Sequence, residues 1–248
     1  ATPYTVSNAL TKGGAAVKLS ALIMGLGNIA HKQIIKGLIF LAIEIGYIMF
    51  MVNAGAYYLS MLPSLGWRKQ EEVFNEQKQI YEYVQGDNSL LILLYGITVI
   101  FIICAYIILA VSSLKSAYNV ELRMKQGKHI NTFVEDIKAL FNENLHKLLL
   151  VLPVTGILVF TILPLVFMIS MAFTTYSKVD SHLVLFDWVG LENFKLIFNS
   201  GSSIGQSFWS VFGWTIIWAV LATFLNYILG ILVALLINRK GTKFKSFW

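Results

Sequence analysis

The sequence has 248 residues, of which 57% are apolar and only 13% carry a charge. Because about a quarter of the residues in a soluble domain are charged, this chain has too few polar side chains to coat a water-soluble globule. The net charge of +6 does not indicate a nucleic-acid-binding protein, because the basic residues stand beside apolar runs and not on a polar domain. Cys104 is the only cysteine, which excludes an internal disulfide framework.

The first apolar stretch, residues 19–30, is too short to cross a bilayer, since a spanning helix needs about 20 mostly apolar residues. It lies between Lys18 and His31 and contains two glycines. Irregular backbone at membrane depth must be covered by protein or lie at a wet surface. We therefore interpret the stretch as an interfacial or re-entrant segment within an N-terminal region, residues 1–36.

Four longer runs can each cross a membrane as a helix. They cover residues 37–62, 90–111, 148–174 and 208–237. None of them alternates strictly between apolar and polar residues, as the strands of a membrane β-barrel do. The sequence therefore predicts an all-α integral membrane protein with four transmembrane helices and short interfacial helices.

The basic residues predict the orientation of the spans, because Lys and Arg collect in cytoplasmic loops. Four precede the first span, six lie in the segment 112–147 and four follow the fourth span, whereas the loops 63–89 and 175–207 hold three and two. We expect both termini to be cytoplasmic. The chain then divides into the N-terminal segment, a region 37–111 with its outer loop, a cytoplasmic region 112–147, and the region 148–248.

The segment "INTFVEDIKALFNENLHK" carries the signature of a helix start. Thr132 and Glu135 stand three residues apart, as in a capping box, and apolar residues follow at helical spacing. We predict an amphipathic helix that begins near Phe133, lies on the membrane and turns into the third span at Pro153. A solvated linker helix is the alternative.

The outer loops each suggest a further helix. Residues 71–85 read as a short polar helix with its apolar residues on one side: Val73, Ile80 and Val84. The stretch "GLENFKLIF" reads as a helix at the outer membrane surface, with a larger apolar face made of Leu191, Phe194, Ile197 and Phe198.

Nothing in the sequence indicates a catalytic, cofactor-binding or metal site. The four histidines are His31, His129, His146 and His182, and none has a second His or Cys at the spacing of metal ligands. We place His146 at the inner interface, near a helix end. No phosphate-binding glycine-rich loop and no nucleophile motif is present, so an intramembrane enzyme has no support.

Polar residues inside the spans are the candidate functional residues. Glu44 is the only Asp, Glu, Lys, Arg or His deep in a span, and a charge there costs about 2–3 kcal/mol. It serves either as an ion relay or, as we favour, as a carboxyl that faces the bundle and is protonated or hydrogen-bonded to Tyr, Thr or Asn. Asn226 in the fourth span either hydrogen-bonds across helices, which we favour, or lines a polar path. Pro164 should kink or loosen the third span.

Several stretches resemble one family, the membrane permeases of maltose/oligosaccharide ABC importers, and specifically the larger of the two membrane subunits. They are "KQIIKGLIFLAIEIGY", "FVEDIKALFNENLHKLLLVLPVTGILVFTILPLVFMISMAFTTYS", "DWVGLENFKLIF" and "FWSVFGWTIIWAVLATFLNYILGILVALLINRKGTKFKSFW". The resemblance runs from about residue 19 onward. It implies the N-terminal part of a type I importer permease fold in the bacterial cell membrane.

The resemblance also implies partners and a substrate. These are a second permease subunit in a heterodimer, a cytoplasmic ATPase dimer, an extracellular sugar-binding protein, membrane lipid and an oligosaccharide of the maltodextrin type. The chain itself would not be an enzyme, since ATP hydrolysis would occur on the separate ATPase subunits. A non-transport assembly or anchoring subunit is the alternative function.

The basic tail bears on where the chain stops. Arg239, Lys240, Lys243 and Lys245 fix the inner end of the fourth span, and we expect the aromatic residues around them to begin an interfacial helix. Members of the resembled family continue with four more spans and an ATPase-contacting loop. We therefore expect the sequence to be truncated at Trp248, with the sugar-contacting residues beyond it.

Overall fold

The computed structural model describes residues 4–69, 71–84, 86–176, 178–179, 182–183, 185–199 and 201–239. Most of the basic tail, including Lys240, Lys243 and Lys245, and the aromatic residues predicted to start a further helix lie outside these ranges. The chain divides into two units, residues 1–188 and residues 189–248, which are described separately.

The described residues contain four helical stretches that are long and apolar enough to cross a membrane, as the sequence predicted. They are Ile34–Met61, Ser89–Lys125, Leu145–Met171 and Ser203–Asn238. The second is much longer than the predicted 90–111: its 37 residues make about 55 Å of helix at 1.5 Å per residue. Because a hydrocarbon core is about 30 Å thick, a large part of this helix lies outside the membrane.

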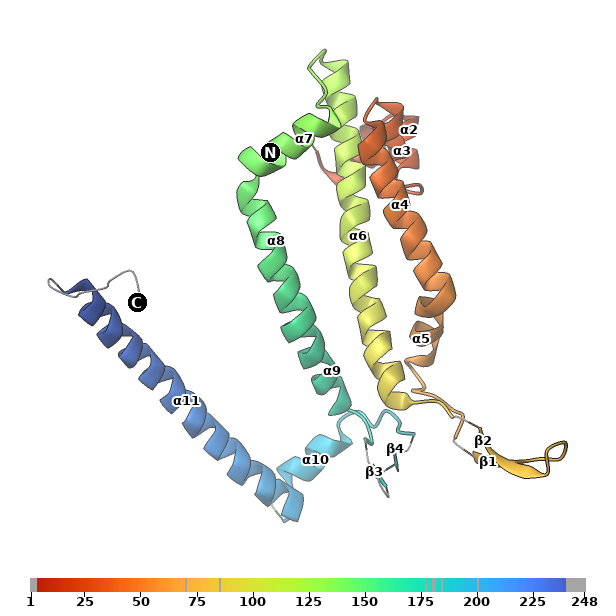
Figure 1. Cartoon of the computed structure of the whole chain (residues 1–248), viewed down its shortest axis with the longest axis vertical. Helices are drawn as coiled ribbons and strands as arrows, with labels where there is room; N and C mark the ends of the chain where they lie inside the picture. The colour runs from red at the N-terminus through yellow and green to blue at the C-terminus, as the bar shows by residue number, and fades with distance from the viewer. Residues whose placement is uncertain are drawn as a thin grey trace. The chain divides into compact units, whose positions relative to one another are not determined.

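The first unit begins with three short helices, α1 (Val6–Lys12), α2 (Ala15–Leu19) and α3 (Leu26–Ala30). The first span follows as α4 (Ile34–Phe50), a π-helical turn η1 (Met51–Gly55) and α5 (Ala56–Met61). The second span, α6 (Ser89–Lys125), lies beside it (Figure 1). The short helices pack on α4 and on the last turns of α6, around a small core of Ala9, Val17, Leu114, Ala117 and Tyr118.

The third span is reached through α7 (Phe133–Asn142), which opens with the predicted capping box at Thr132 and Glu135. It consists of α8 (Leu145–Ile157), a π-helical turn η2 (Leu158–Ile162) and α9 (Leu163–Met171). The chain turns into it at residues 143–144, so the prediction of a turn at Pro153 is wrong. Asn144 leaves the helical conformation there, at φ −111° and ψ 20°, whereas Pro153 lies inside α8.

The third span departs from regular α-helix just before Pro164, close to where the sequence predicts a kink or loosening. The π-helical turn η2 ends at Ile162, and Pro164 therefore falls in the first turn of α9. The helix is continuous through this point, since Ile162 and Leu163 keep helical φ and ψ, so the missing N–H of Pro164 leaves the preceding turn one backbone donor short. The third span accommodates this proline by a local change of helical register.

The region predicted as a polar helix, 71–85, is a β-hairpin, and that prediction is wrong. Strand β1 (Glu71–Asn75) pairs antiparallel with β2 (Ile80–Val84). The Asn75 side chain accepts hydrogen bonds from the amides of Gln77 and Lys78, which closes a turn in place of a helix. Phe74 stands opposite Tyr81 with ring centroids 5.1 Å apart, and such cross-strand aromatic pairs stabilise hairpins. Gln85 lies outside the described residues.

A second hydrophobic core lies at the end of the first unit opposite the short helices. It joins Met61, Leu65, Ile92, Leu93, Ile97 and Phe186, with residues of α9 against it. The Trp188 indole donates to the carbonyl of Leu62 (2.9 Å), and the Phe186 amide donates to Ser89 Oγ (3.2 Å). The short hairpin of β3 (Lys178–Val179) and β4 (His182–Leu183) precedes this segment.

The described residues of the second unit form α10 (Glu192–Phe198) and α11 (Ser203–Asn238). The predicted helix in "GLENFKLIF" is confirmed as α10. The Trp209 indole of α11 donates to the carbonyl of Ile197 (3.1 Å), and its ring lies 5.8 Å from that of Phe198. The apolar residues at the end of α10 therefore pack on the start of α11.

Candidate functional site

Glu44, the carboxyl predicted to lie within the first span, is buried between the first two spans and the short helices. Its Oε2 accepts a hydrogen bond from the Met24 amide (2.8 Å) and its Oε1 accepts one from the Tyr106 hydroxyl (3.3 Å). The Tyr106 ring stacks on Tyr47, with centroids 3.8 Å apart and planes within 6°. Both oxygens thus have a donor, as a buried carboxyl requires.

These contacts match the bundle-facing arrangement that we favoured for Glu44. The sequence predicts a Tyr, Thr or Asn side chain as the hydrogen-bond partner of Glu44, and Tyr106 is one. The backbone amide of Met24 is a partner that the sequence does not predict. A proton relay needs a chain of groups that exchange protons, and the side chain hydrogen-bonded to Glu44 in the described structure is the Tyr106 phenol. The role of Glu44 in transport stays a prediction.

Asn226, the second candidate, lies in α11 with its side chain exposed on that unit. The two candidates belong to separate units, and each is described only within its own. A helix that presents an amide on an apolar surface has a group suited to hydrogen bonding with another helix. Pairing of Asn226 stays a prediction.

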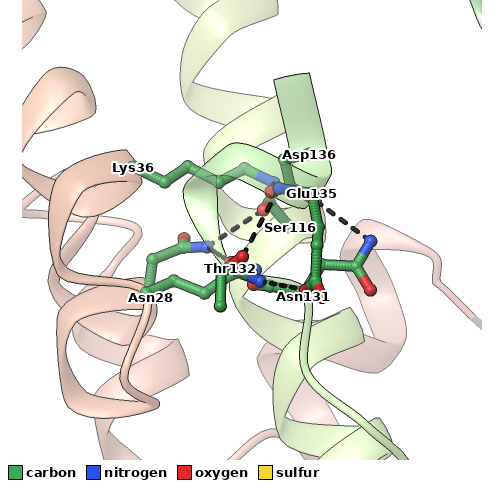
Figure 2. Close-up of polar contacts among 8 residues, drawn as sticks. Asn28, Lys36, Ser116, Asn131, Thr132, Glu135 and Asp136 are labelled. Atoms are coloured by element: carbon green, nitrogen blue, oxygen red, sulfur yellow. Dashed lines mark hydrogen bonds and ion pairs between the residues drawn. The ribbon is translucent and has the colours of Figure 1, made fainter. Parts of the chain in front are cut away.

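A cluster of polar side chains, here called the polar junction, joins α3, α4, α6 and the start of α7 (Figure 2). Asn28 Nδ2 donates both to Gln33 Oε1 (2.9 Å) and to Ser116 Oγ (3.0 Å). Gln33 Nε2 in turn donates to the carbonyl of Asn131 (3.0 Å), immediately before the capping box. Asn28 is fully buried, so these bonds fix the packing of α3 against α6.

An ion pair completes the polar junction. Lys36 Nζ lies 3.0 Å from Asp136 Oδ2, and Asn131 Nδ2 donates to Asp136 Oδ1 (3.2 Å). Glu135 closes the capping box by accepting from the Thr132 amide (2.7 Å). That amide, followed by the His129 ring, holds the pKa of the Glu135 carboxyl below its ordinary value. The start of α7 is therefore tied to the start of the first span.

The polar junction borders a small cavity of about 80 Å³. Its wall is mostly polar and comprises Gln33, Lys36, Ser116, Asn119, Val120, Arg123, Ile130, Asn131 and Asp136. Sites for drug-sized ligands occupy about 300–1,000 Å³, so an oligosaccharide does not fit here. The arrangement serves to position α7, and with it the third span.

The described residues hold no group of three or more His, Cys, Asp or Glu side chains placed to bind a metal ion. His31 Nδ1 lies 2.6 Å from the Gly27 carbonyl, and His129 Nε2 lies 3.0 Å from Glu135 Oε2. His146 is the second residue of α8, near a helix end as predicted, and His182 lies in β4.

Glu121 is a buried carboxylate that the sequence pattern does not predict. Only 5% of its surface is exposed, and its two oxygens accept from the amide of Gly14 (2.8 and 3.1 Å). The ammonium group of Lys125, one turn further along α6, also contacts it. In the sequence Glu121 follows the apolar run by ten residues and resembles an ordinary solvated helix position. No periodic pattern marked it.

Sequence comparisons confirm the resemblance to permeases of sugar ABC importers. The chain is 32% identical over 231 residues to the maltodextrin transport system permease protein MalC of Streptococcus pneumoniae, which covers 92% of this chain and 49% of the relative. It is 34% identical over 241 residues to the maltodextrin transport system permease protein MdxF of Bacillus subtilis, covering 95% and 51%.

A third relative is named for a different sugar. The galactooligosaccharides transport system permease protein GanP of Bacillus subtilis is 28% identical over 236 residues, covering 93% of this chain and 51% of the relative. The chain thus spans about half the length of the curated relatives it matches. No protein-family model matches it, and no solved structure matches it either. With permeases as relatives and four helices able to span a bilayer, the chain is a multi-pass protein of the bacterial cell membrane.

Proposed function

We propose that this chain is part of the membrane permease of an ATP-driven bacterial importer for maltodextrin-like oligosaccharides and forms part of its translocation pathway. The observation that carries the proposal is the similarity to transport-system permeases over more than nine-tenths of the chain. The alternative, a membrane assembly or anchoring subunit without a transport role, is not favoured, because these relatives are all named as permeases.

The substrate class is proposed from the same relatives. Two are named for maltodextrin at 32% and 34% identity, and one for galactooligosaccharides at 28%. Both names describe neutral oligosaccharides, and the higher identities favour the α-glucan type. The cavity of about 80 Å³ at the polar junction is too small for such a sugar, and a neighbouring cavity of about 290 Å³ beside Lys32 and Phe133 is at the lower limit for a drug-sized ligand. We therefore expect the sugar to bind elsewhere in the full permease.

The proposed partners are those of an ATP-driven importer: a second permease subunit, a pair of cytoplasmic ATPases and an extracellular sugar-binding protein. The distribution of Lys and Arg supports an orientation with both ends of the chain inside. In that orientation the α7 end of the first unit faces the cytoplasm, and the β1–β2 hairpin lies outside.

Uptake measurements test the proposed function. The gene is deleted in its bacterial host, and uptake of radiolabelled maltotriose and of a labelled galactotriose is measured with and without a plasmid copy. We expect maltotriose uptake to fall at least tenfold in the deletion strain and to be restored by the plasmid. Loss of galactotriose uptake alone would contradict the substrate proposal, and unchanged uptake of both sugars would contradict the transport role.

Cysteine labelling tests the orientation. Gln126→Cys and Gln77→Cys are made separately in a Cys104→Ser background, because both glutamines are exposed in the loops at opposite ends of the first unit. An impermeant thiol reagent on intact cells should label the Gln77→Cys protein and leave the Gln126→Cys protein unlabelled until the cells are opened. The reverse pattern would overturn the orientation.

A further inference from the structure

The turn between α2 and α3 presents apolar side chains at its tip. Leu22 is 76% exposed, and Leu19 and Ile23 are almost half exposed. Met24, the next residue, is buried. No charged residue lies between Lys18 and His31. A water-exposed turn ordinarily carries polar residues, so the apolar side chains of this tip favour an apolar environment.

The backbone N–H groups of this turn all donate hydrogen bonds. Each of the eight consecutive amides from Ser20 to Gly27 has an acceptor within the protein. The acceptors for three of them are side chains: Glu44 for Met24, Ser113 for Gly25 and Ser20 for Gly27. In a turn exposed to water, water molecules can accept hydrogen bonds from the amides. Inside a bilayer there is no water, so the protein itself must supply an acceptor for every backbone N–H.

The packing of the turn places it beside the start of the first span. Gly25 lies so close to Gly37 that a Cβ on Gly25 would come within 2.1 Å of the Gly37 carbonyl oxygen. Glu44, which holds the Met24 amide, is seven residues further along α4, or about 10 Å of helix. Residue 37 is where the sequence predicts the first span to enter the membrane.

We propose that residues 19–25 form a re-entrant turn that inserts Leu19, Leu22 and Ile23 among the lipid acyl chains of the leaflet at the α7 end. Glu44 is the positioning residue that holds the turn at this depth. Its carboxylate accepts the Met24 amide at the point where α3 begins, and so replaces a water molecule that the bilayer does not supply. Lys18 and Lys32 flank the turn at the level of the lipid headgroups.

We assign lipid as the occupant of the exposed tip because Gly25, which follows the tip, packs against Gly37 of the first span. Leu38 and Ile39, just after Gly37, are also exposed apolar residues, and they belong to a helix that crosses the bilayer. The depth of insertion is therefore that of an interfacial element, about 5–10 Å into the leaflet. The proposal depends on the membrane location of the chain and not on transport.

Fluorescence quenching tests the insertion directly. Leu22→Cys in a Cys104→Ser background is labelled with an environment-sensitive fluorophore, and the purified protein is reconstituted into phosphatidylcholine vesicles. Val52→Cys, exposed in the first span, and Ser7→Cys, exposed on α1, are the matched controls for lipid and for water. We expect lipids brominated near the headgroup end of their acyl chains to quench the Leu22 probe at least half as strongly as the Val52 probe, with iodide ineffective. A Leu22 probe that behaves like the Ser7 probe would overturn the proposal.

The role of Glu44 is tested with the same probe. Glu44→Gln keeps a carbonyl oxygen for the Met24 amide, so lipid quenching of the Leu22 probe should be unchanged. Glu44→Leu leaves that amide without an acceptor, and we expect the probe to lose lipid quenching and become accessible to iodide. If the probe stays lipid-quenched with Glu44→Leu, or loses quenching with Glu44→Gln, Glu44 does not position the turn as proposed.

Discussion

The Glu121 carboxylate and the Gly14 amide join the second span to the start of α2. Both carboxylate oxygens lie within hydrogen-bond distance of this single amide, at 2.8 and 3.1 Å. Gly14 is the N-cap residue of α2 and offers no side chain to cap it. The carboxylate therefore caps α2 from another helix, and it does so at the positive end of the helix dipole.

Removing this cap should loosen the N-terminal helices. Glu121→Ala leaves the Gly14 amide without its acceptor, which costs about 1–3 kcal/mol, whereas Glu121→Gln retains an acceptor and should cost less. The measurement is the rate of limited trypsin cleavage after Lys12 and Lys18 in detergent-purified protein, which should rise severalfold for Glu121→Ala. Glu143→Ala, at an exposed position, is the control. Equal cleavage of all variants would show that the cap is not needed.

Gly25 should tolerate no side chain. Its φ of +83° lies in the left-handed region, which costs other residues about 1–2 kcal/mol, and a Cβ would collide with the Gly37 carbonyl. Gly25→Ala should lower the thermal unfolding midpoint by several degrees or prevent accumulation. Gly46→Ala, on α4 with no atom near its added Cβ, should leave the midpoint unchanged or raise it. Similar midpoints for the two variants would contradict the close approach of Gly25 and Gly37.

Glu44→Gln should leave transport intact. The amide side chain can accept from the Met24 amide and donate to the Tyr106 oxygen, so the packing contacts remain while the ionisable group is lost. Maltotriose uptake by cells that carry the Glu44→Gln gene should stay within about twofold of the uptake by parent cells. A twofold change corresponds to a free-energy difference of about 0.4 kcal/mol. Uptake that collapses while the protein accumulates normally would instead favour an ion relay.

The ion pair of Lys36 and Asp136 should be lost when one charge is reversed and restored when both charges are exchanged. The two side chains are 33% and 26% exposed, so the pair contributes about 0.2–1 kcal/mol. Lys36→Asp places two carboxylates side by side and should lower the unfolding midpoint by a few degrees. The double variant Lys36→Asp/Asp136→Lys should recover most of the loss. A double variant less stable than Lys36→Asp would argue against direct pairing.

Protection of α7 should depend on pH through Glu135. Because its pKa is lower in the folded protein than the ordinary 4.5, its contribution is present above that value and is lost as pH falls through the folded pKa. Hydrogen exchange at the first turn of α7, corrected for the intrinsic rate, should accelerate as pH falls below about 4.5. In Glu135→Gln, which cannot titrate, this acceleration should be absent. Equal pH profiles for parent and variant would refute the assignment.

The sequence by itself determined the spans and several helix starts. A run of about 20 apolar residues has one stable form in a bilayer, because a helix satisfies its own backbone hydrogen bonds. The four spans could therefore be predicted from composition alone, although the length of α6 could not. The capping box at Thr132 and Glu135 was equally readable, since all of its contacts lie within four residues.

The tertiary structure decided whatever depends on distant partners. Residues 71–84 have apolar side chains at a spacing that suits a helix or a strand, and the Asn75 turn and the Phe74–Tyr81 pair select the hairpin. Glu44 could be recognised as unusual because a carboxyl among apolar residues is costly, but its donor, the Met24 amide, is 20 residues away. Glu121 and Gly14 are 107 residues apart. Neither local propensity nor periodicity encodes such pairs, because packing of the short helices on α4 and α6 brings them together.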